Sequence, residues 1–327
     1  MRVAGTFTGI AGFELGFMRA GMEHTAMCEI IPHRQRVLTR HFPTTPIGGD
    51  IRGVHGSDLG RPDVVCGGFP CKDLSIGKGG RKGLAGDHSG LFWEFHRLVA
   101  EHLRLTDETG ARWLVMENTP GIVGYNNGAD LDTVCREVEQ LGYGWAWRVV
   151  DARSFGSPQK RPRWILVAHR GGDAGPARQV LGLTDSGQQA DPAYRVGSAA
   201  GQGGRPTADS AARDGVHVWR KSARPRAALS KGGYETWVPA EFANTLTGFD
   251  GGAATRQTHL IMQGGRLRTL TLTEWERLSG FPDGWTDTMP DSERFAALGD
   301  CFHVATAEWL GRQLKHVHES VPMLPAA

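Results

Sequence analysis

The first 170 residues alternate short β-forming runs with amphipathic segments, and this alternation restricts the fold more than any other feature of the chain. Strands that alternate with helices are typical of a parallel sheet covered by helices. Strands are expected at residues 3–7, 25–29, 64–66, 113–116, 146–150 and 164–168. Helices are expected at residues 12–20, 32–41, 91–103 and 131–141. The sequence therefore predicts one doubly wound α/β domain.

The composition changes after this domain. From Gly171 to about Gly215 the chain is rich in Gly, Ala, Ser, Gln, Asp and Pro, which indicates a linker or a flexible insertion. A basic stretch that contains tryptophan follows, "RDGVHVWRKSARPRAALSKGGYETW", and then "RTLTLTEWERLSGFP" restores helical spacing. A last helix at about residues 306–316 is expected to pack on the open face of the sheet. With 327 residues, the chain can form one large domain or two unequal ones.

Cysteine usage and charge exclude several classes of protein. The five cysteines are an odd number without a CxxC pair, which argues against a disulfide framework and a zinc ribbon. Reduced thiols and no metal site are therefore expected. No apolar run reaches the roughly 18 residues that span a bilayer, and no secretory signal is visible, so a cytoplasmic protein is expected. The net charge of +2 neither requires nor excludes a polyanionic partner.

Glycines and an acid at the ends of the first two strands suggest a nucleotide-like ligand. Gly9 and Gly12 in "FTGIAGFELG" allow a tight turn between strand and helix, where a ligand can approach backbone amides. Glu29 ends the second expected strand. Its spacing from Gly9 along the sequence is about that at which an acid reaches the ribose of a bound nucleoside. The glycines could equally be structural, and Glu29 could be a solvated acid. Together they suggest a cofactor that contains adenosine.

A thiol and a carboxyl are expected to face each other at the same edge of the sheet. Pro70 stiffens the chain just before Cys71, and a basic loop rich in glycine follows; Glu117 comes directly after the strand at residues 113–116. A cysteine is strongly nucleophilic near neutral pH, and a shielded carboxyl can carry a proton there. Cys71 could instead fill the core. A cysteine protease would require a histidine, but neither His88 nor His96 lies at a strand end.

Two arginines precede the last expected strand of the domain. Arg161 and Arg163 alternate in "SPQKRPRWILVAH", so both lie on one side of an extended chain. Arginines that serve solubility alone are rarely found before a buried strand. An ion pair with an acid at the edge of the core is the alternative explanation.

Taken together, these motifs closely resemble the DNA cytosine-5 methyltransferase family. The match is in order along the chain and comprises "FTGIAGFELG", "CEI", "GDI", "GGFPCKDLS", "GLFWEF", "MENTPG", "SFGSPQKRPR", "RTLTLTEWERLSGFPD" and "LGDCFHVATAEWLG". The part without a match, from Gly171 to about Arg266, corresponds to the variable region that recognises the target sequence in the family. The resemblance implies a Rossmann-like sheet of S-adenosylmethionine-dependent methyltransferases with a second, smaller target-recognition domain. It implies that residues 1–175 and 286–327 form the catalytic domain, and residues 176–285 the recognition domain and hinge.

The resemblance also implies a mechanism. A cytosine is flipped out of duplex DNA, because its carbon 6 is unreachable in the stack. Cys71 attacks that carbon, Glu117 holds ring nitrogen 3 and the exocyclic amine, Arg163 binds the base oxygen and Arg161 supports the site. S-adenosylmethionine donates the methyl group to carbon 5. The enzyme is expected to be monomeric and to belong to a restriction-modification system.

The family's other contacts can be carried over residue by residue. The residues implied in the cofactor pocket are Phe7, Gly9, Gly12, Glu29, Ile30, Asp50, Ile51, Pro70 and Asp300. Thr245 of "NTLTG" matches a threonine that contacts the DNA backbone in the family, and the basic loop with Lys78, Arg81 and Lys82 is implied to close over the flipped base and touch phosphates. The basic stretch has no family match; it supplies candidate phosphate or base contacts, about half of which could instead be solvated side chains: Arg220, Lys221, Arg224 and Arg226.

Three positions depart from the family pattern. Gly5 stands where the family usually has Asp, Asp300 where it has Asn, and Thr119 where it has Val. One hypothesis is that Asp300 replaces the acid missing at Gly5; the alternative is an unusual methyl donor.

Two rival functions are compatible with a chain that resembles this family. A tRNA cytosine methyltransferase would carry a Cys-Phe-Thr tripeptide, which is absent, and a catalytically silent paralogue would have lost Cys71 or Glu117.

Overall fold

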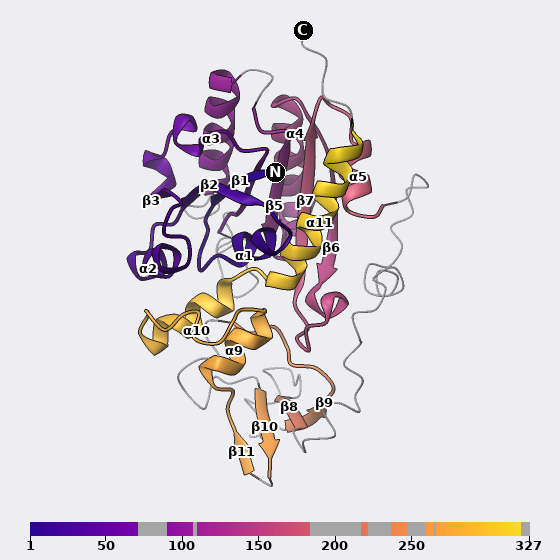
Figure 1. Cartoon of the computed structure of the whole chain (residues 1–327). Helices are drawn as coiled ribbons and strands as arrows, with labels where there is room; N and C mark the ends of the chain where they lie inside the picture. Colours follow the sequence, from indigo (N-terminus) through magenta and orange to yellow (C-terminus); the bar gives the residue numbers. More distant parts are fainter. Residues whose placement is uncertain are drawn as a thin grey trace.

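A seven-stranded sheet forms the centre of the computed structural model (Figure 1). The structure describes residues 1–70, 90–106, 110–183, 217–221, 237–247, 259–264 and 266–321. The strand order is β3-β2-β1-β4-β5-β7-β6. The strands are β1 (Arg2–Thr6), β2 (Glu23–Cys28), β3 (Ile47–Gly48), β4 (Val64–Gly68), β5 (Trp113–Asn118), β6 (Tyr143–Asp151) and β7 (Pro162–Arg170). The α/β class is confirmed, and β3, which spans only two residues, was not predicted.

The expectation of a fully parallel sheet was wrong at β7. Strands β1 to β5 pair in parallel, whereas β7 runs antiparallel to both β5 and β6. A parallel neighbour requires a crossover of about a dozen residues or more, usually through a helix. Only residues 152–161 connect β6 to β7, and they contain the short 3-10 helix η7 (Ala152–Phe155). The two strands therefore form a hairpin, and β7 lies between β5 and β6.

The predicted helices are present, with longer or shifted ends. On the sheet they are α1 (Gly12–Arg19), α2 (Pro32–His41), α3 (Leu91–Thr106), α4 (Ala129–Gln140) and α11 (Val304–Ser320). An additional helix, α5 (Gly175–Val180), lies where the sequence indicated a linker. Its Ala177 and Val180 are fully buried, so this part of the segment belongs to the core. None of the described helices is long and apolar enough to cross a membrane.

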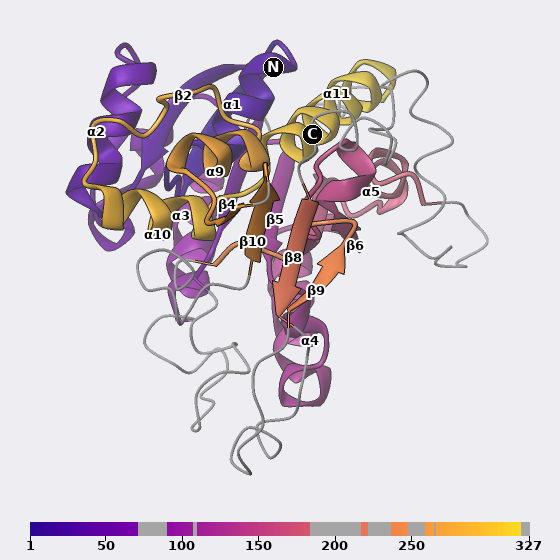
Figure 2. The ribbon, with the colours of Figure 1, turned by 90° about the horizontal axis from the view of Figure 1, so that it is seen from below.

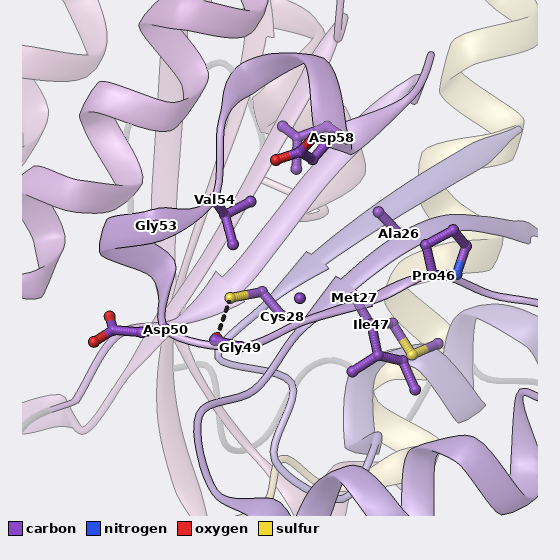
Figure 3. A pocket seen from close by; sticks show the side chains of 12 residues that line it. Ala26, Met27, Cys28, Pro46, Ile47, Gly49, Asp50, Gly53, Val54 and Asp58 are labelled. Carbon is purple, nitrogen blue, oxygen red and sulfur yellow. Dashed lines mark hydrogen bonds between the residues drawn. The ribbon is translucent and has the colours of Figure 1, made fainter.

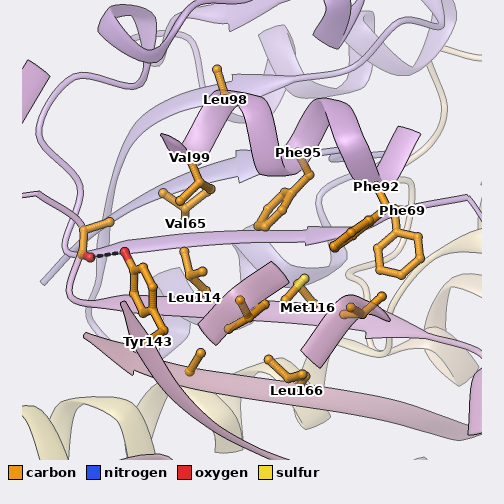
Figure 4. Close-up of a cluster of buried hydrophobic side chains, with 14 of the residues drawn as sticks. Val65, Phe69, Phe92, Phe95, Leu98, Val99, Leu114, Met116, Tyr143 and Leu166 are labelled. Atoms are coloured by element: carbon orange, nitrogen blue, oxygen red, sulfur yellow. Dashed lines mark hydrogen bonds between the residues drawn. The ribbon is translucent and has the colours of Figure 1, made fainter. Parts of the chain in front are cut away.

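Two apolar layers cover the faces of the sheet. On one face, α3 and α4 pack on the strands through side chains such as Phe95, Leu98 and Leu114 (Figure 4). On the other face, α1 and α11 pack on each other and on the strands, as predicted for the last helix (Figure 1). Their close approach depends on Gly16, because a Cβ there would overlap Ala307.

A second, smaller sheet lies at one end of the molecule (Figures 1 and 2). Its antiparallel strands, in the order β11-β10-β8-β9, are β8 (His217–Lys221), β9 (Trp237–Ala240), β10 (His259–Gln263) and β11 (Arg266–Arg268). Helices α9 (Leu272–Ser279) and α10 (Asp291–Asp300) lie between the two sheets in Figure 1. A third apolar cluster joins Trp275 and Trp285 to Ile10 and Leu38, so the chain after β11 is anchored on the α1 and α2 side of the large sheet.

Candidate active site at the carboxyl edge of the sheet

The turn between β1 and α1 adopts a conformation that ordinary residues rarely take. Phe7, Gly9 and Ala11 all have positive φ angles, of 52°, 60° and 70°. The turn is tied to β2, because Thr8 donates its amide to the Cys28 carbonyl at 3.0 Å and its hydroxyl accepts from the Cys28 amide at 3.3 Å. A Cβ built on Gly9 would have no neighbour within 4 Å. The turn is therefore fixed by the protein and open on the side of Gly9.

Glu29, which the sequence predicted as a ribose-binding acid, contacts this turn. Its Oε2 accepts a hydrogen bond from the Gly9 amide at 2.7 Å, and its Oε1 accepts one from the Ile31 amide at 2.9 Å. The neighbouring Ile30 is 57% exposed, which is unusual for a large apolar side chain. An acid and an exposed apolar surface beside an open glycine turn suit a ligand with a hydroxylated sugar and a flat ring. Gly12 has no such freedom, since a Cβ there would overlap the Phe302 carbonyl.

The remaining residues of the predicted cofactor pocket differ in environment. Asp50 caps the 3-10 helix η1 (Ile51–Gly53) and pairs with Arg52 at 2.5 Å, which lowers the pKa of its carboxyl. Ile51 is buried in the core, and Pro70 is half-buried at the end of the described chain before the basic loop. Contact of Asp50, Ile51 and Pro70 with a ligand at the carboxyl edge of the sheet stays a prediction.

A cavity of about 510 Å³ lies beside these residues, between β2, β3 and the 3-10 helices η1 and η2 (Gly56–Leu59) (Figure 3). It is lined by Ala26, Met27, Cys28, Pro46, Ile47, Gly48, Gly49, Asp50, Gly53, Val54, Asp58 and Leu59. The Cys28 thiol donates to the Gly49 carbonyl at 3.1 Å inside it. Asp50 is the one lining residue that also belongs to the predicted cofactor set. The cavity therefore adjoins the predicted cofactor residues rather than coinciding with them.

Glu117 and Arg163 form a nearly buried ion pair at the ends of β5 and β7. Arg163 Nε lies 2.8 Å from Glu117 Oε1, and the two side chains are 11% and 15% exposed. Burial raises the pKa of the Glu117 carboxyl, while Arg163 and Arg161 oppose that rise. A Cβ on Gly68, which pairs with Glu117, would lie 2.6 Å from its Oε2. The sequence analysis gave an ion pair with an acid as the alternative explanation for the two arginines. Arg163 forms such a pair, and the acid is Glu117, the predicted catalytic carboxyl.

Asn118 secures the same corner, and the sequence analysis did not single it out. Its amide donates to the Phe69 carbonyl at 3.1 Å, and its Oδ1 accepts from the Thr119 amide at 2.8 Å. This joins the end of β5 to the segment that leads into Cys71. The available signal was its place directly after Glu117 at the end of an apolar strand. Cys71 itself lies outside the described residues, but Gly68, three positions earlier, pairs with Glu117.

Arg161 has a different environment from Arg163. It is 2% exposed, and its guanidinium donates to three backbone carbonyls: Leu246 at 3.1 Å, Gly299 at 2.8 Å and Cys301 at 2.5 Å. Burial, together with Arg163, lowers its pKa to about 10. Arg161 therefore joins β7 to the segment after β9 and to the end of α10. The supporting role that the resemblance implied for Arg161 stays a prediction.

Asp300 and Gly5 do not meet the same neighbours. Asp300 is largely exposed and pairs with Arg34 of α2 at 2.9 Å. A Cβ on Gly5 would overlap Oε1 of Glu14, a carboxyl that the sequence analysis did not consider. The hypothesis that Asp300 replaces the acid missing at Gly5 is therefore not favoured by these positions. The carboxyl beside Gly5 belongs to Glu14.

The predicted DNA contacts are described only in part. The Thr245 hydroxyl donates to the Lys160 carbonyl at 2.6 Å, and an isolated bridge pairs Gln159 with Ala243. This places Thr245 beside the arginine motif. Arg220 lies in β8, where the backbone alone is described. The predicted contacts that lie outside the described residues are Lys78, Arg81, Lys82, Arg224 and Arg226. Lys221 is the last residue of β8.

Comparisons with known proteins place the chain among methyltransferases. A family model described as C-5 cytosine-specific DNA methylase matches residues 1–183. The Type II methyltransferase M2.BsuMI of Bacillus subtilis is 29% identical over 330 residues, covering 98% of this chain and 77% of that protein. M.NgoBI of Neisseria gonorrhoeae is 27% identical over 310 residues, covering 92% and 89%. Among solved structures, the S. pombe Dnmt2 methyltransferase shares the fold with a TM-score of 0.67 at 14% identity, covering 97% of this chain and 98% of that one.

Proposed function

Because the chain belongs to the C-5 cytosine-specific DNA methylase family, whose model matches 183 of its 327 residues, we propose that it methylates cytosine at one specific sequence in duplex DNA. The family assignment confirms the resemblance and makes the chain a DNA (cytosine-5) methyltransferase. The names of M2.BsuMI and M.NgoBI as Type II methyltransferases support a fixed recognition sequence and a restriction-modification context.

The observation that carries the proposed mechanism is the Glu117–Arg163 pair. It lies at the strand end that pairs with the segment leading into Cys71. Burial raises the pKa of the Glu117 carboxyl, so this group can hold a proton closer to neutral pH than an exposed glutamate. Arg163 fixes its orientation with a hydrogen-bonded charge, and its remaining N–H groups are suited to a neutral oxygen acceptor such as the cytosine carbonyl.

The proposed reaction uses these groups on a cytosine that is flipped out of the duplex. The Cys71 thiolate adds to carbon 6 while Glu117 donates its proton to ring nitrogen 3, so electron density moves to carbon 5. S-adenosylmethionine supplies the methyl group. Loss of the carbon 5 proton to a base then expels the Cys71 thiolate, ring nitrogen 3 returns its proton to Glu117, and the ring regains its double bond between carbons 5 and 6. Arg161 holds the backbone around Gly299 and Leu246 rather than touching the base.

The residues around the β1–α1 turn fit this cofactor. The open side of Gly9, the Glu29 carboxylate and the exposed Ile30 side chain offer partners for the amino acid end, the ribose and the adenine. We assign Glu29 to the ribose and Ile30 to the adenine. Phe7, Asp50, Ile51, Pro70 and Asp300 complete the proposed set.

Sequence recognition is assigned to the chain between Gly171 and about Arg266, because the catalytic groups lie outside it and the reading of base edges requires a separate surface. Strands β8, β9 and β10 fall in this segment, and β11 begins at its end. The basic residues Arg220 and Arg224 of the segment are the proposed base or phosphate contacts, and Thr245 is proposed to contact the DNA backbone. Exchange of this segment for that of a relative is expected to change the modified sequence.

One assay separates the proposed function from methylation of tRNA. The protein is incubated with duplex DNA, tRNA and labelled S-adenosylmethionine, and the modified nucleoside is identified by mass spectrometry. We expect 5-methylcytosine in DNA alone. Label in tRNA would contradict the proposal, and no label in either substrate would favour the silent paralogue.

A further inference from the structure

A buried carboxyl lies beneath the proposed cofactor turn and has no part in the mechanism above. Glu14, in the first turn of α1, is 1% exposed, and its Oε2 has no hydrogen-bond partner within the described structure. The space for its carboxyl exists because residue 5 is glycine, since a Cβ on Gly5 would overlap Glu14 Oε1. Gly5 and Glu14 therefore depend on each other.

Glu14 supports the turn through Thr8. The Thr8 hydroxyl forms a hydrogen bond with the Glu14 carboxyl, and Thr8 is also bonded in both directions to Cys28 of β2. The next residue, Gly9, donates its amide to Glu29. The carboxyl thus lies directly behind the segment whose open side faces the proposed cofactor. A buried hydrocarbon would fill this space at less cost, because an incompletely paired polar group in the interior is destabilising.

In the described part of the chain, no cation compensates the charge that Glu14 would carry. Burial raises its pKa to about 8, and the charge of Glu29, which follows β2, adds to the rise. His24 of β2 contacts the Glu14 carbonyl through Nε2 at 2.9 Å, and burial lowers its pKa to about 4, so its ring is neutral. Burial also raises the pKa of the Cys66 thiol on β4, which is neutral too. In the protein alone, Glu14 therefore holds a proton at neutral pH.

We propose that Glu14 is a positioning residue of the cofactor turn, and that its carboxyl releases its proton to solvent when a sulfonium cofactor binds above it. The buried anion and the bound cation then stabilise each other, an interaction that the neutral thioether product lacks. The enzyme would in this way favour the methyl donor over the spent cofactor. The inference rests on the proposed function for the identity of the cofactor.

The matched variant is Glu14→Gln, which keeps the size and hydrogen-bonding groups of the side chain but cannot ionise. Binding of S-adenosylmethionine and of S-adenosylhomocysteine is measured by calorimetry at pH 7 in two buffers of different ionisation enthalpy. For S-adenosylmethionine, we expect the native protein to release more protons than the variant. We also expect the variant to bind this donor about tenfold more weakly, with little change for S-adenosylhomocysteine. The amine of each ligand contributes equally to both proteins, so the difference reports Glu14.

Two further measurements keep the outcomes separate. The melting temperature of each ligand-free protein is followed from pH 5 to 9; the native protein should lose stability relative to the variant up to about pH 8, whether or not any cofactor binds. The double variant Gly5→Asp/Glu14→Ala moves the carboxyl to β1. It should recover part of the preference for S-adenosylmethionine over S-adenosylhomocysteine that the single variant Glu14→Ala loses. Equal proton release by native protein and Glu14→Gln, with donor binding intact, would overturn the inference. Absence of donor binding in both would instead overturn the proposed function.

Discussion

The end of β5 and the start of α1 both lie at the carboxyl edge of the same sheet, and each contains a glutamate with a buried carboxyl. At the end of β5, Glu117 is paired with Arg163 at 2.8 Å. At the start of α1, Glu14 has Thr8 as its partner and Glu29 as an unfavourable neighbour. Among the residues that the structure describes, the first carboxyl has a positive partner, whereas the second has none. The comparison teaches that the carboxyl in one half of the site is balanced by a charge of the protein, whereas the carboxyl in the other half is balanced by its own proton.

The largest expected effect concerns the half of the site that contains Glu117. Glu117→Gln keeps the shape of the side chain but removes the proton that it would transfer, so kcat should fall by about 10²- to 10⁴-fold. Binding of S-adenosylmethionine should stay close to the native value, because Glu117 lies outside the proposed cofactor set. Single-turnover methylation and calorimetric titration measure the two quantities. Loss of cofactor binding with an unchanged rate would reverse the assignment of the two halves.

The second effect concerns Arg161, whose neighbours are backbone carbonyls rather than an acid. Arg161→Ala leaves the carbonyls of Leu246, Gly299 and Cys301 without their donor in a buried site, and should lower the free energy of unfolding by about 3 kcal/mol. Urea unfolding followed by circular dichroism measures the change. The exposed Arg136 provides the control, and its replacement by Ala should cost less than about 0.5 kcal/mol. If Arg161→Ala had the same free energy of unfolding as the native protein, these hydrogen bonds would contribute little to stability.

The third effect is a pH dependence of stability at the half of the site that contains Glu14. From its ordinary pKa of 4.5 up to about 8, Glu14 is protonated in the folded protein and ionised in the unfolded chain. The free energy of unfolding of native protein relative to Glu14→Gln should therefore fall as pH rises, by up to about 1.4 kcal/mol per pH unit, and level off above pH 8. Urea unfolding of both proteins at several pH values gives this difference. A difference that does not vary with pH would show that Glu14 is already ionised.

The smallest effect is expected at Asp300, which is largely exposed and paired with Arg34. Exposed ion pairs contribute about 0 to 1 kcal/mol, so Asp300→Asn should weaken S-adenosylmethionine binding by less than about fivefold. Gly5→Asp should not restore the loss, because an added side chain meets Glu14. A double-mutant cycle in calorimetric affinities tests the coupling. Strong coupling between residues 5 and 300 would favour the hypothesis drawn from the sequence over the one drawn from Glu14.

The sequence predicted those features that a local pattern determines. The alternation of strands and helices located β1, β2, β4 and β5, and the residues after them identified Glu29 and Glu117 at one edge. It did not predict the direction of β7, because apolar periodicity is the same in parallel and antiparallel strands. The shortness of the connection at residues 152–161 was the available signal.

Pairs of residues from distant segments were harder to predict. Arg161 and Arg163 are equivalent in the sequence pattern, yet one binds backbone carbonyls from two later segments and the other binds Glu117. The relation between Gly5 and Glu14 depends on how α1 packs over β1, which no spacing rule expresses. An apparent loss at Gly5 therefore suggested Asp300 as the replacement, when the nearest carboxyl lies nine positions along the chain.

The central claim is the proposal that Cys71, three positions after the residue that pairs with Glu117, is the nucleophile that attacks cytosine. The most direct measurement is covalent trapping on duplex DNA that carries 5-fluorocytosine at the target site, in the presence of S-adenosylmethionine. Fluorine at carbon 5 cannot leave as a proton does, so expulsion of the thiolate stalls after methyl transfer. We predict a complex that survives denaturing electrophoresis with the native protein and is absent with Cys71→Ser, which should still bind the DNA. Methyl transfer to ordinary cytosine by a protein that never forms this complex would contradict the account.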